Sequence, residues 1–227
     1  GLTGAFALDG ALLQGRTMLN LDTEEWGAIC IGCAGGGDSQ ISLPVSYEGA
    51  PGNFLSFQLA VEGLKGGHSG VDIHEYRANA IVLLASVLVP LAEMGTRIVS
   101  VQGGDKTNAI PREAFATLLL PPEAMADAQI AVAERTESLR SEYGSLEKGM
   151  RVSLVGLEDA PAECLSAEAQ GNLMGLLRTL PHGALKYSHT IPGLVETSNN
   201  LASVASVDGN YLVVCSSRSS IMEALED

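Results

Sequence analysis

Two hydrophobic periods, one of strands and one of helices, alternate along this chain and constrain its fold most. Phe54–Val61 alternates large apolar and polar side chains, which predicts a strand. Apolar residues then recur at helical spacing, which predicts one amphipathic helix: Ile73, Ile81, Leu84, Leu88 and Leu91. The pattern continues with strands over 97–102 and 114–120 and a helix over 123–143 that Pro121 and Pro122 open.

The second half of the chain has a similar order of elements. A strand is expected over 151–157 and a helix over 166–180, with Ser166 as its N-cap. Further strands are expected over 183–189, 201–207 and 211–216, before a helical start at 221–225. The sequence therefore predicts an α/β protein of the α+β kind, an antiparallel sheet with helices packed on one face, in two β-α-β-β-α halves.

Composition excludes several functional classes. The 227 residues include 13 Lys and Arg against 27 Asp and Glu, a formal net charge of −14. Nucleic-acid binding depends largely on cations that neutralise phosphates, so no nucleic-acid partner is expected. No apolar run reaches the roughly 18–20 residues that a membrane-spanning helix needs, so no membrane partner is expected either.

The four cysteines, at 30, 33, 164 and 215, do not form a disulfide scaffold. Cys30 and Cys33 form a C-x-x-C pair, but a run of glycines follows, whereas a redox motif normally opens a helix. We interpret them as small buried residues rather than redox or zinc-binding ones. A reduced, cytoplasmic protein is expected.

His68 is the most informative candidate for chemistry. It lies in Gly66-Gly67-His68-Ser69-Gly70, where glycines let a backbone approach a ligand closely and the imidazole can donate or accept a hydrogen bond. A turn with a solvated histidine is an equally good interpretation of these residues alone. His182 and His189 have nothing nearby in sequence that completes a site, and we interpret them as structural.

Three other residues are weaker candidates. Asp22 ends an apolar run, where a carboxylate can bind a metal, although an acidic turn is commoner. Asn108 lies between two expected strands and offers a donor and an acceptor, but asparagine is also an ordinary turn residue. Arg218, in a run of serines, suits a carboxylate through paired hydrogen bonds, with a surface arginine as the alternative.

Taken together, four segments resemble the bacterial Xaa-His dipeptidases, which are carnosinase-like members of the aminoacylase and carboxypeptidase-G type of zinc metallopeptidases. The segments are Leu21-Asp22-Thr23-Glu24-Glu25, Gly32-Cys33-Ala34-Gly35-Gly36, Gly63-Leu64-Lys65-Gly66-Gly67-His68-Ser69-Gly70 and Asn108-Ala109-Ile110-Pro111-Arg112-Glu113. Their order and spacing match along essentially the whole chain.

The resemblance implies a catalytic domain that holds two zinc ions and an inserted lid domain that forms a homodimer. It implies that Asp22 is a ligand of one zinc ion. It further implies that His68 reaches from the lid into the partner's active site and stabilises the tetrahedral intermediate. By the same resemblance, Asn108 contacts substrate and Arg218 holds the substrate's terminal carboxylate.

The chain also departs from the family's pattern. The other metal ligands and the general base of the family have no counterpart in it, because Gly1 begins just after the Glu-Glu segment should end. We therefore expect residues 1–43 to be a piece of the catalytic domain and 44–227 to be a lid domain truncated at its C-terminus. We expect this chain to bind no zinc and to hydrolyse nothing by itself.

Two alternatives remain open. The chain could be a non-catalytic dimerisation or binding module, or it could belong to another member of the family, such as a tripeptidase, an aminoacylase or a desuccinylase. In each case, we expect the helix from Val71 and its neighbouring edge strand to make the two-fold contact of the dimer.

Overall fold

The computed structural model describes residues 4, 7–17, 19, 26–27, 29, 32–159 and 161–226. The chain forms two compact units, 1–33 and 34–227. In the first unit, the 3₁₀ helix η1 (Gly10–Leu12) is capped by the side chain of Asp9, which accepts a hydrogen bond from the amide of Ala11. All other elements described here belong to the second unit. The expected division into 1–43 and 44–227 stays a prediction.

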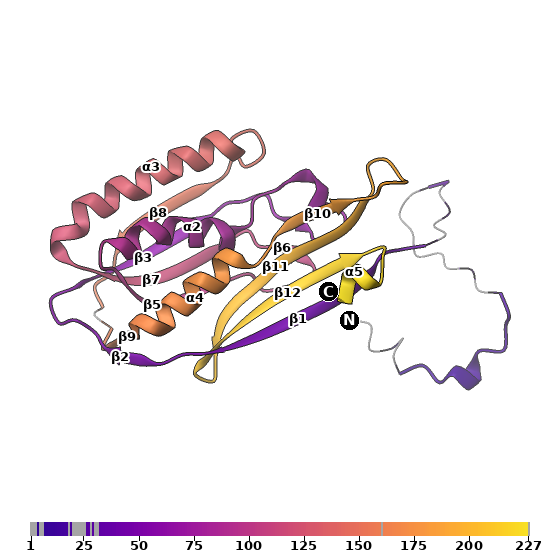
Figure 1. Ribbon diagram of the computed structural model, residues 1–227, viewed down its shortest axis with the longest axis horizontal. Coiled ribbons are helices and arrows are strands. Elements are labelled where there is room, and N and C mark those ends of the chain that lie inside the picture. Colours follow the sequence, from indigo (N-terminus) through magenta and orange to yellow (C-terminus); the bar gives the residue numbers. More distant parts are fainter. Residues whose placement is uncertain are drawn as a thin grey trace. The chain divides into compact units, whose positions relative to one another are not determined.

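One large antiparallel sheet organises the second unit (Figure 1). Its strands lie in the order β1-β12-β11-β5-β7-β3-β8, and β10 pairs with β11 outside this path. The strand bounds are β1 Gly35–Pro44, β3 Leu55–Glu62, β5 Arg97–Gly103, β7 Ala114–Leu120, β8 Arg151–Gly156, β10 Gly183–Tyr187, β11 Val195–Val207 and β12 Asn210–Ser219. Two small sheets complete the set, β2 (Tyr47–Gly49) with β9 (Glu163–Leu165) and β4 (Gly67–His68) with β6 (Ala109–Ile110).

Three helices cover one face of the sheet (Figure 1). They are α2 (Ala80–Glu93), α3 (Met125–Tyr143) and α4 (Ala167–Thr179). Their apolar side chains share one buried cluster with alternate residues of the strands, such as Leu59, Leu118 and Leu201. Short helices η2 (Ile73–Glu75), η3 (Pro122–Ala124) and α5 (Glu223–Glu226) occupy connections and the C-terminal end. The predicted fold class, an antiparallel sheet with helices on one face, is confirmed.

Local signals placed most elements correctly. The side chain of Ser166 accepts a hydrogen bond from the amide of Ala169, which confirms it as the N-cap of α4. Gly95 has a left-handed backbone after α2, as expected of a residue that ends a helix. Pro90 lies inside the last turn of α2 without ending it.

The structure corrects the division into two similar halves. Strand β8, expected to begin the second half, pairs with β3 at the edge of the first. The second half instead gains β1, which pairs along its whole length with β12 and begins at the run of glycines that follows Cys33. A glycine-rich strand carries little hydrophobic pattern, which explains why β1 had no signal in the sequence.

The start of the helix expected in the dimer contact is also corrected. The helix begins at Ala80 rather than Val71, and Asn79 caps it by accepting hydrogen bonds from the amides of Ile81 and Val82. The strand that follows it, β5, is not an edge, because β7 and β11 flank it on both sides. The ends of the strand order are β1 and β8, and the two-fold contact of the dimer stays a prediction.

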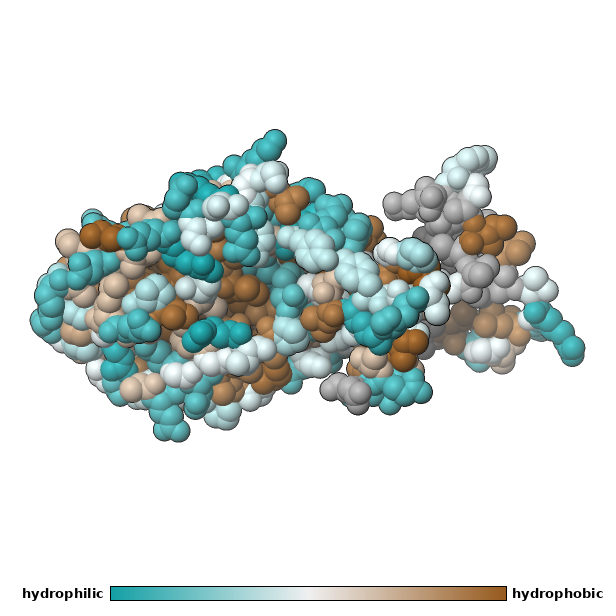
Figure 2. Space-filling view, turned by 45° about the horizontal axis from the view of Figure 1, so that its top comes forward, coloured by the Kyte–Doolittle hydropathy of each residue, from teal (hydrophilic) through white to brown (hydrophobic). Residues whose placement is uncertain are grey.

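The surface of the molecule is mixed. Figure 2 shows hydrophobic side chains reaching the surface as scattered groups among hydrophilic ones. Cys33 is exposed, so the expectation of a buried residue is wrong there, while Cys164 and Cys215 are buried and Cys30 lies outside the described residues. Among the residues described, no helix is long and apolar enough to cross a membrane.

We predict that Gly104→Ala lowers the free energy of unfolding by about 3 kcal/mol. Gly104 has a φ of 66°, and a methyl group there would collide with the carbonyl oxygen of Ala202, where β11 approaches the end of β5. Urea unfolding measures the change. Gly37→Ala is the control, because a methyl group at Gly37 meets no atom within 4 Å. Equal effects of the two substitutions would show that the approach of β11 to β5 does not require glycine.

Candidate functional site

The two-stranded ribbon of β4 and β6 brings His68 and Asn108 together. His68 pairs with Ala109 and Gly67 with Ile110. Next to these pairs, the amide of Ser69 donates a 2.9 Å hydrogen bond to the carbonyl oxygen of Asn108. Both predicted site residues are exposed, and the ribbon holds them on neighbouring strands although 40 positions separate them in sequence (108 − 68).

The imidazole of His68 is oriented by its own loop. Its Nδ1 accepts hydrogen bonds from the amides of Gly70 and Val71, each at 3.1 Å. A nitrogen that accepts carries no proton, so these bonds assign the proton of the neutral ring to Nε2. His68 therefore presents an N–H donor at its exposed edge.

Asp72 and Arg77 brace the same loop from inside. The Oδ2 atom of Asp72 accepts a 2.8 Å hydrogen bond from the amide of His68, and its Oδ1 accepts one of 2.9 Å from Arg77. Arg77 also donates to the carbonyl oxygen of Gly66 and to Glu75. A hydrogen bond from Lys65 and a second one from Arg77 hold the pKa of the Glu75 carboxyl below its usual value. The backbone on each side of His68 is thus fixed by charged hydrogen bonds.

Arg218 reaches this loop from strand β12. A Cβ atom placed on Gly70 would lie 3.0 Å from both Cζ and Nε of Arg218, so only a glycine lets the guanidinium group lie so close to the backbone. The Nε atom of Arg218 is buried and has no hydrogen-bond partner within the described part of the chain. The third predicted residue therefore joins the other two, with an unused donor.

Asn200, on β11, holds the loop that carries Asn108. Its side-chain amide donates hydrogen bonds of 3.1 Å to the carbonyl oxygen of Thr107 and 2.9 Å to that of Ala109. The side chain is almost fully buried, with 1% of the residue exposed. Sequence reasoning missed Asn200, because the strand expected here begins at Leu201 and the partners of the Asn200 side chain lie far away in sequence.

Alternation along the strands explains this gathering. Ser198 pairs with Arg218 and Asn200 with Ser216, so these four side chains lie on one face of β11 and β12. Leu201 belongs to the core beneath the helices, so the polar face is the opposite one. The ribbon of β4 and β6 makes its contacts with Asn200 and Arg218 there.

Asp22 is the residue for which a metal-binding role was predicted. Asp22 lies outside the described residues. Within the described ranges, no three His, Cys, Asp or Glu side chains are grouped so that they could hold a metal ion. The residues that surround His68 therefore do not form a metal site of their own.

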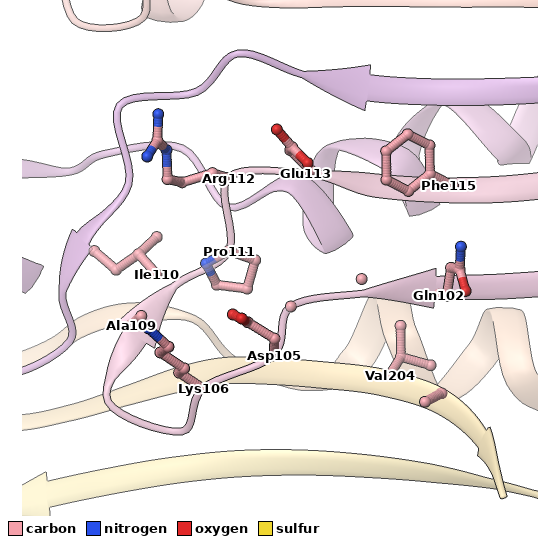
Figure 3. Close-up of a pocket in the computed structure, with 13 residues that line it drawn as sticks. Gln102, Asp105, Lys106, Ala109, Ile110, Pro111, Arg112, Glu113, Phe115 and Val204 are labelled. Carbon is pink, nitrogen blue, oxygen red and sulfur yellow. The ribbon is translucent and has the colours of Figure 1, made fainter.

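A hollow of about 670 Å³ lies beside the loop that carries Asn108 (Figure 3). Gln102, Asp105, Lys106, Arg112, Glu113 and Phe115 are among the residues that line it. His68, Asn108 and Arg218 do not line it, although they are described. The hollow is therefore next to the gathered residues and separate from them.

His182 contacts Asn79, which lies at the end of the loop that carries His68. Its Nδ1 lies 3.2 Å from the side-chain amide nitrogen of Asn79, which also donates to the carbonyl oxygen of Leu201. Burial lowers the pKa of His182 to about 4, and a hydrogen bond with the backbone of Arg77 opposes this shift. The interpretation of His182 as structural agrees with these contacts, because its side chain joins β10 to the end of the His68 loop.

Comparison with known proteins decides the family. The peptidase dimerisation domain matches residues 59–147. A cytosol non-specific dipeptidase from Escherichia coli is 38% identical over 97% of this chain. This chain is a homologue of the bacterial dipeptidases. This chain also shares its fold with an aminoacylhistidine dipeptidase from Vibrio alginolyticus. The two are 35% identical, with a TM-score of 0.88 over the whole of this chain.

This chain covers only part of the length of its relatives. It spans 46% of the length of the Escherichia coli protein and 46% of the Vibrio alginolyticus chain. The resemblance to Xaa-His dipeptidases, based on four short segments, is thus confirmed at the level of family and fold.

We predict that the free energy of unfolding of this chain falls as the pH drops from 7 to 5, and that His182 alone contributes about 2 kcal/mol to the fall. The folded-state pKa is about 4 and the ordinary value is 6.5, so the unfolded chain binds the proton first. The contribution is complete above pH 6.5 and is lost as the pH approaches 4. Urea unfolding at several pH values measures it. The slope between pH 5 and 7 should shrink in His182→Gln and persist in His189→Gln, whose histidine is exposed; an unchanged slope in His182→Gln contradicts the assignment.

Proposed function

We propose that this chain forms the lid and dimerisation region of a metallo-dipeptidase that hydrolyses Xaa-His dipeptides in the cytoplasm. The observation that carries the proposal is that His68, Asn108 and Arg218 come together from distant segments: the amide of Ser69, next to His68, binds the carbonyl oxygen of Asn108, and Arg218 lies against Gly70. The names of its relatives, a cytosol dipeptidase and an aminoacylhistidine dipeptidase, support the class of reaction and the compartment.

Each residue has a distinct role in this proposal. Peptide hydrolysis places negative charge on the former carbonyl oxygen, and the Nε2–H of His68 donates a hydrogen bond to that oxygen. The amide of Asn108 holds the substrate's backbone. Arg218, whose Nε–H lacks a protein acceptor among the described residues, binds the terminal carboxylate of the dipeptide.

The metal belongs to the part of the proposal that depends on other segments. Two zinc ions would supply an activated water for attack on the peptide bond. Among the described residues, those around His68 do not form a group that could hold a metal ion. We therefore propose Asp22 as the one zinc ligand that this chain provides. The remaining ligands and the general base are expected from segments of the whole protein that this sequence does not contain.

The first test concerns His68. In the whole protein, His68→Ala should lower kcat for β-alanyl-His by about 100-fold, because one donor to the developing oxyanion is lost. The zinc content should stay the same. His74→Ala is the matched control, since His74 is exposed on the same loop and makes none of the contacts described above. Normal turnover in His68→Ala would exclude the proposed role.

The second test concerns Arg218. Arg218→Met should raise KM for a dipeptide by about tenfold or more, because a charged hydrogen bond to the carboxylate is removed. A dipeptide whose C-terminus is an amide lacks that carboxylate, so its KM should be similar in the variant and the parent. An equal loss for both substrates would mean that Arg218 only supports the fold.

The third test asks whether His68 serves the partner's active site in a homodimer. His68→Ala and Asp22→Ala subunits, each inactive alone, are mixed and allowed to exchange. If His68 acts across the dimer, mixed dimers contain one intact site and should restore roughly a quarter of the parent's activity. If it acts within its own subunit, or the protein is a monomer by sedimentation, no activity returns.

The alternatives lead to other results. A non-catalytic dimerisation module would show no hydrolysis of any peptide by the whole protein. A tripeptidase, an aminoacylase or a desuccinylase would be revealed by a substrate panel that includes tripeptides and N-acylated amino acids, because pocket contacts rather than fold decide the substrate.

A further inference from the structure

The loop that carries His68 is closed at its base by one buried carboxylate. Glu147, in the turn after α3, accepts a 2.7 Å hydrogen bond from the amide of Lys65 through Oε2. Its Oε1 accepts a 3.0 Å hydrogen bond from the amide of Ala78. Lys65 and Ala78 flank the loop segment 66–77, so the two oxygens of a single side chain hold both ends of that segment.

Burial makes this carboxylate unusual. Only 3% of Glu147 is exposed, and no Lys, Arg or His within the described ranges forms an ion pair with it. Burying a carboxylate without a cation is costly, and backbone N–H donors offset the cost only if the geometry is good. The hydrogen bonds from the backbone amides of Lys65 and Ala78 are therefore the contacts that offset the cost of burying this carboxylate.

The turn that carries Glu147 also fits closely against the start of the loop. A methyl group on Gly63 would collide with the carbonyl oxygen of Gly149, and one on Gly149 would lie 2.6 Å from the carbonyl oxygen of Gly63. The two backbones touch at a pair of glycines. This approach is independent of the hydrogen bonds and places Glu147 within reach of the loop.

A short series of contacts connects the clamp, which consists of the hydrogen bonds of Glu147 with the amides of Lys65 and Ala78, to the imidazole of His68. Lys65 is followed by Gly66 and Ala78 is preceded by Arg77, whose guanidinium donates to the carbonyl oxygen of Gly66. Arg77 also binds Asp72, and Asp72 accepts the amide of His68. Releasing the clamp frees the ends to which these braces are attached.

We propose that Glu147 is a positioning residue for His68: by clamping both ends of the loop, it keeps the ring's Nδ1 on the amides of Gly70 and Val71 and its Nε2–H directed outward. The part concerned with turnover rests on the proposed function. The part concerned with the state of the ring does not, and it is measured separately.

The first experiment reads the ring directly, in Glu147→Gln. The amide side chain has nearly the same shape but turns a donor toward one of the two backbone N–H groups. In the ¹⁵N spectrum of the neutral imidazole, the parent should show Nε2 protonated and Nδ1 accepting, whereas the variant should show a mixture of tautomers. Exchange of the Gly70 and Val71 amide protons should become at least about tenfold faster.

Leu139→Ala is the matched control. Leu139 is fully buried on α3 and makes none of the side-chain hydrogen bonds that hold the loop, and its truncation lowers stability. It should leave the ¹⁵N pattern of His68 unchanged. If Leu139→Ala alters the pattern as much as Glu147→Gln does, or if Glu147→Gln leaves it as in the parent, the proposal is overturned.

Asp72→Asn covers the case in which Glu147→Gln does not fold, as judged by circular dichroism. It cuts the same series of contacts one step from His68, at a partly exposed residue. The same tautomer mixture is expected, and an unchanged ring overturns the proposed series of contacts.

The second experiment uses turnover by the whole protein. Glu147→Gln should lower kcat by about tenfold or more while KM changes little, because a displaced donor affects the transition state most. Combined with His68→Ala, it should cause no further loss, since a residue that acts through His68 has nothing left to position. Additive losses in the double variant overturn the proposal. Inactivity of the parent protein would count against the proposed function and leave the spectroscopic result to decide the role of Glu147.

Discussion

The alternation of side chains along paired strands is the constraint on which the site depends. In β11 and β12, one set of residues faces the helices and fills the core, so the other set must face away. Ser198, Asn200, Ser216 and Arg218 belong to the second set. Because β11 lies next to β5, this polar face is brought to the loops that precede α2 and β7. A slip of one residue in this register would direct Arg218 into the core.

Much of the fold followed from local patterns in the sequence. The bounds 114–120 of β7 were predicted without error, and the cap of α4 at Ser166 was recognised, because each depends on a few neighbouring residues. Strand β11 was expected to begin at Leu201 and begins at Val195. Residues 197–200 are polar and lie outside the predicted strand. In the structure they belong to β11, and the side chains of Thr197, Asn199 and Asn200 make hydrogen bonds with other segments of the chain.

The site was predicted less completely, for a physical reason. His68 and Asn108 lie among glycines and turn residues that mark an unusual backbone, and Arg218 lies in a run of serines at the end of an expected strand. Asn200 and Glu147 escaped notice because each acts on backbone groups far away in sequence, 91 and 93 positions for Asn200 and 82 and 69 for Glu147. Such contacts leave no local pattern. They become visible only when the strands and turns are placed in space.

The state of the His68 ring has a consequence for selectivity among ligands. A histidine binds a metal ion through a nitrogen that bears a lone pair, and in this loop the lone pair of Nδ1 is turned toward two backbone amides. The outward nitrogen carries a proton instead. Coordination of a metal ion through Nε2 would require the proton to move to Nδ1 and both amide hydrogen bonds to break, so this arrangement disfavours His68 as a metal ligand.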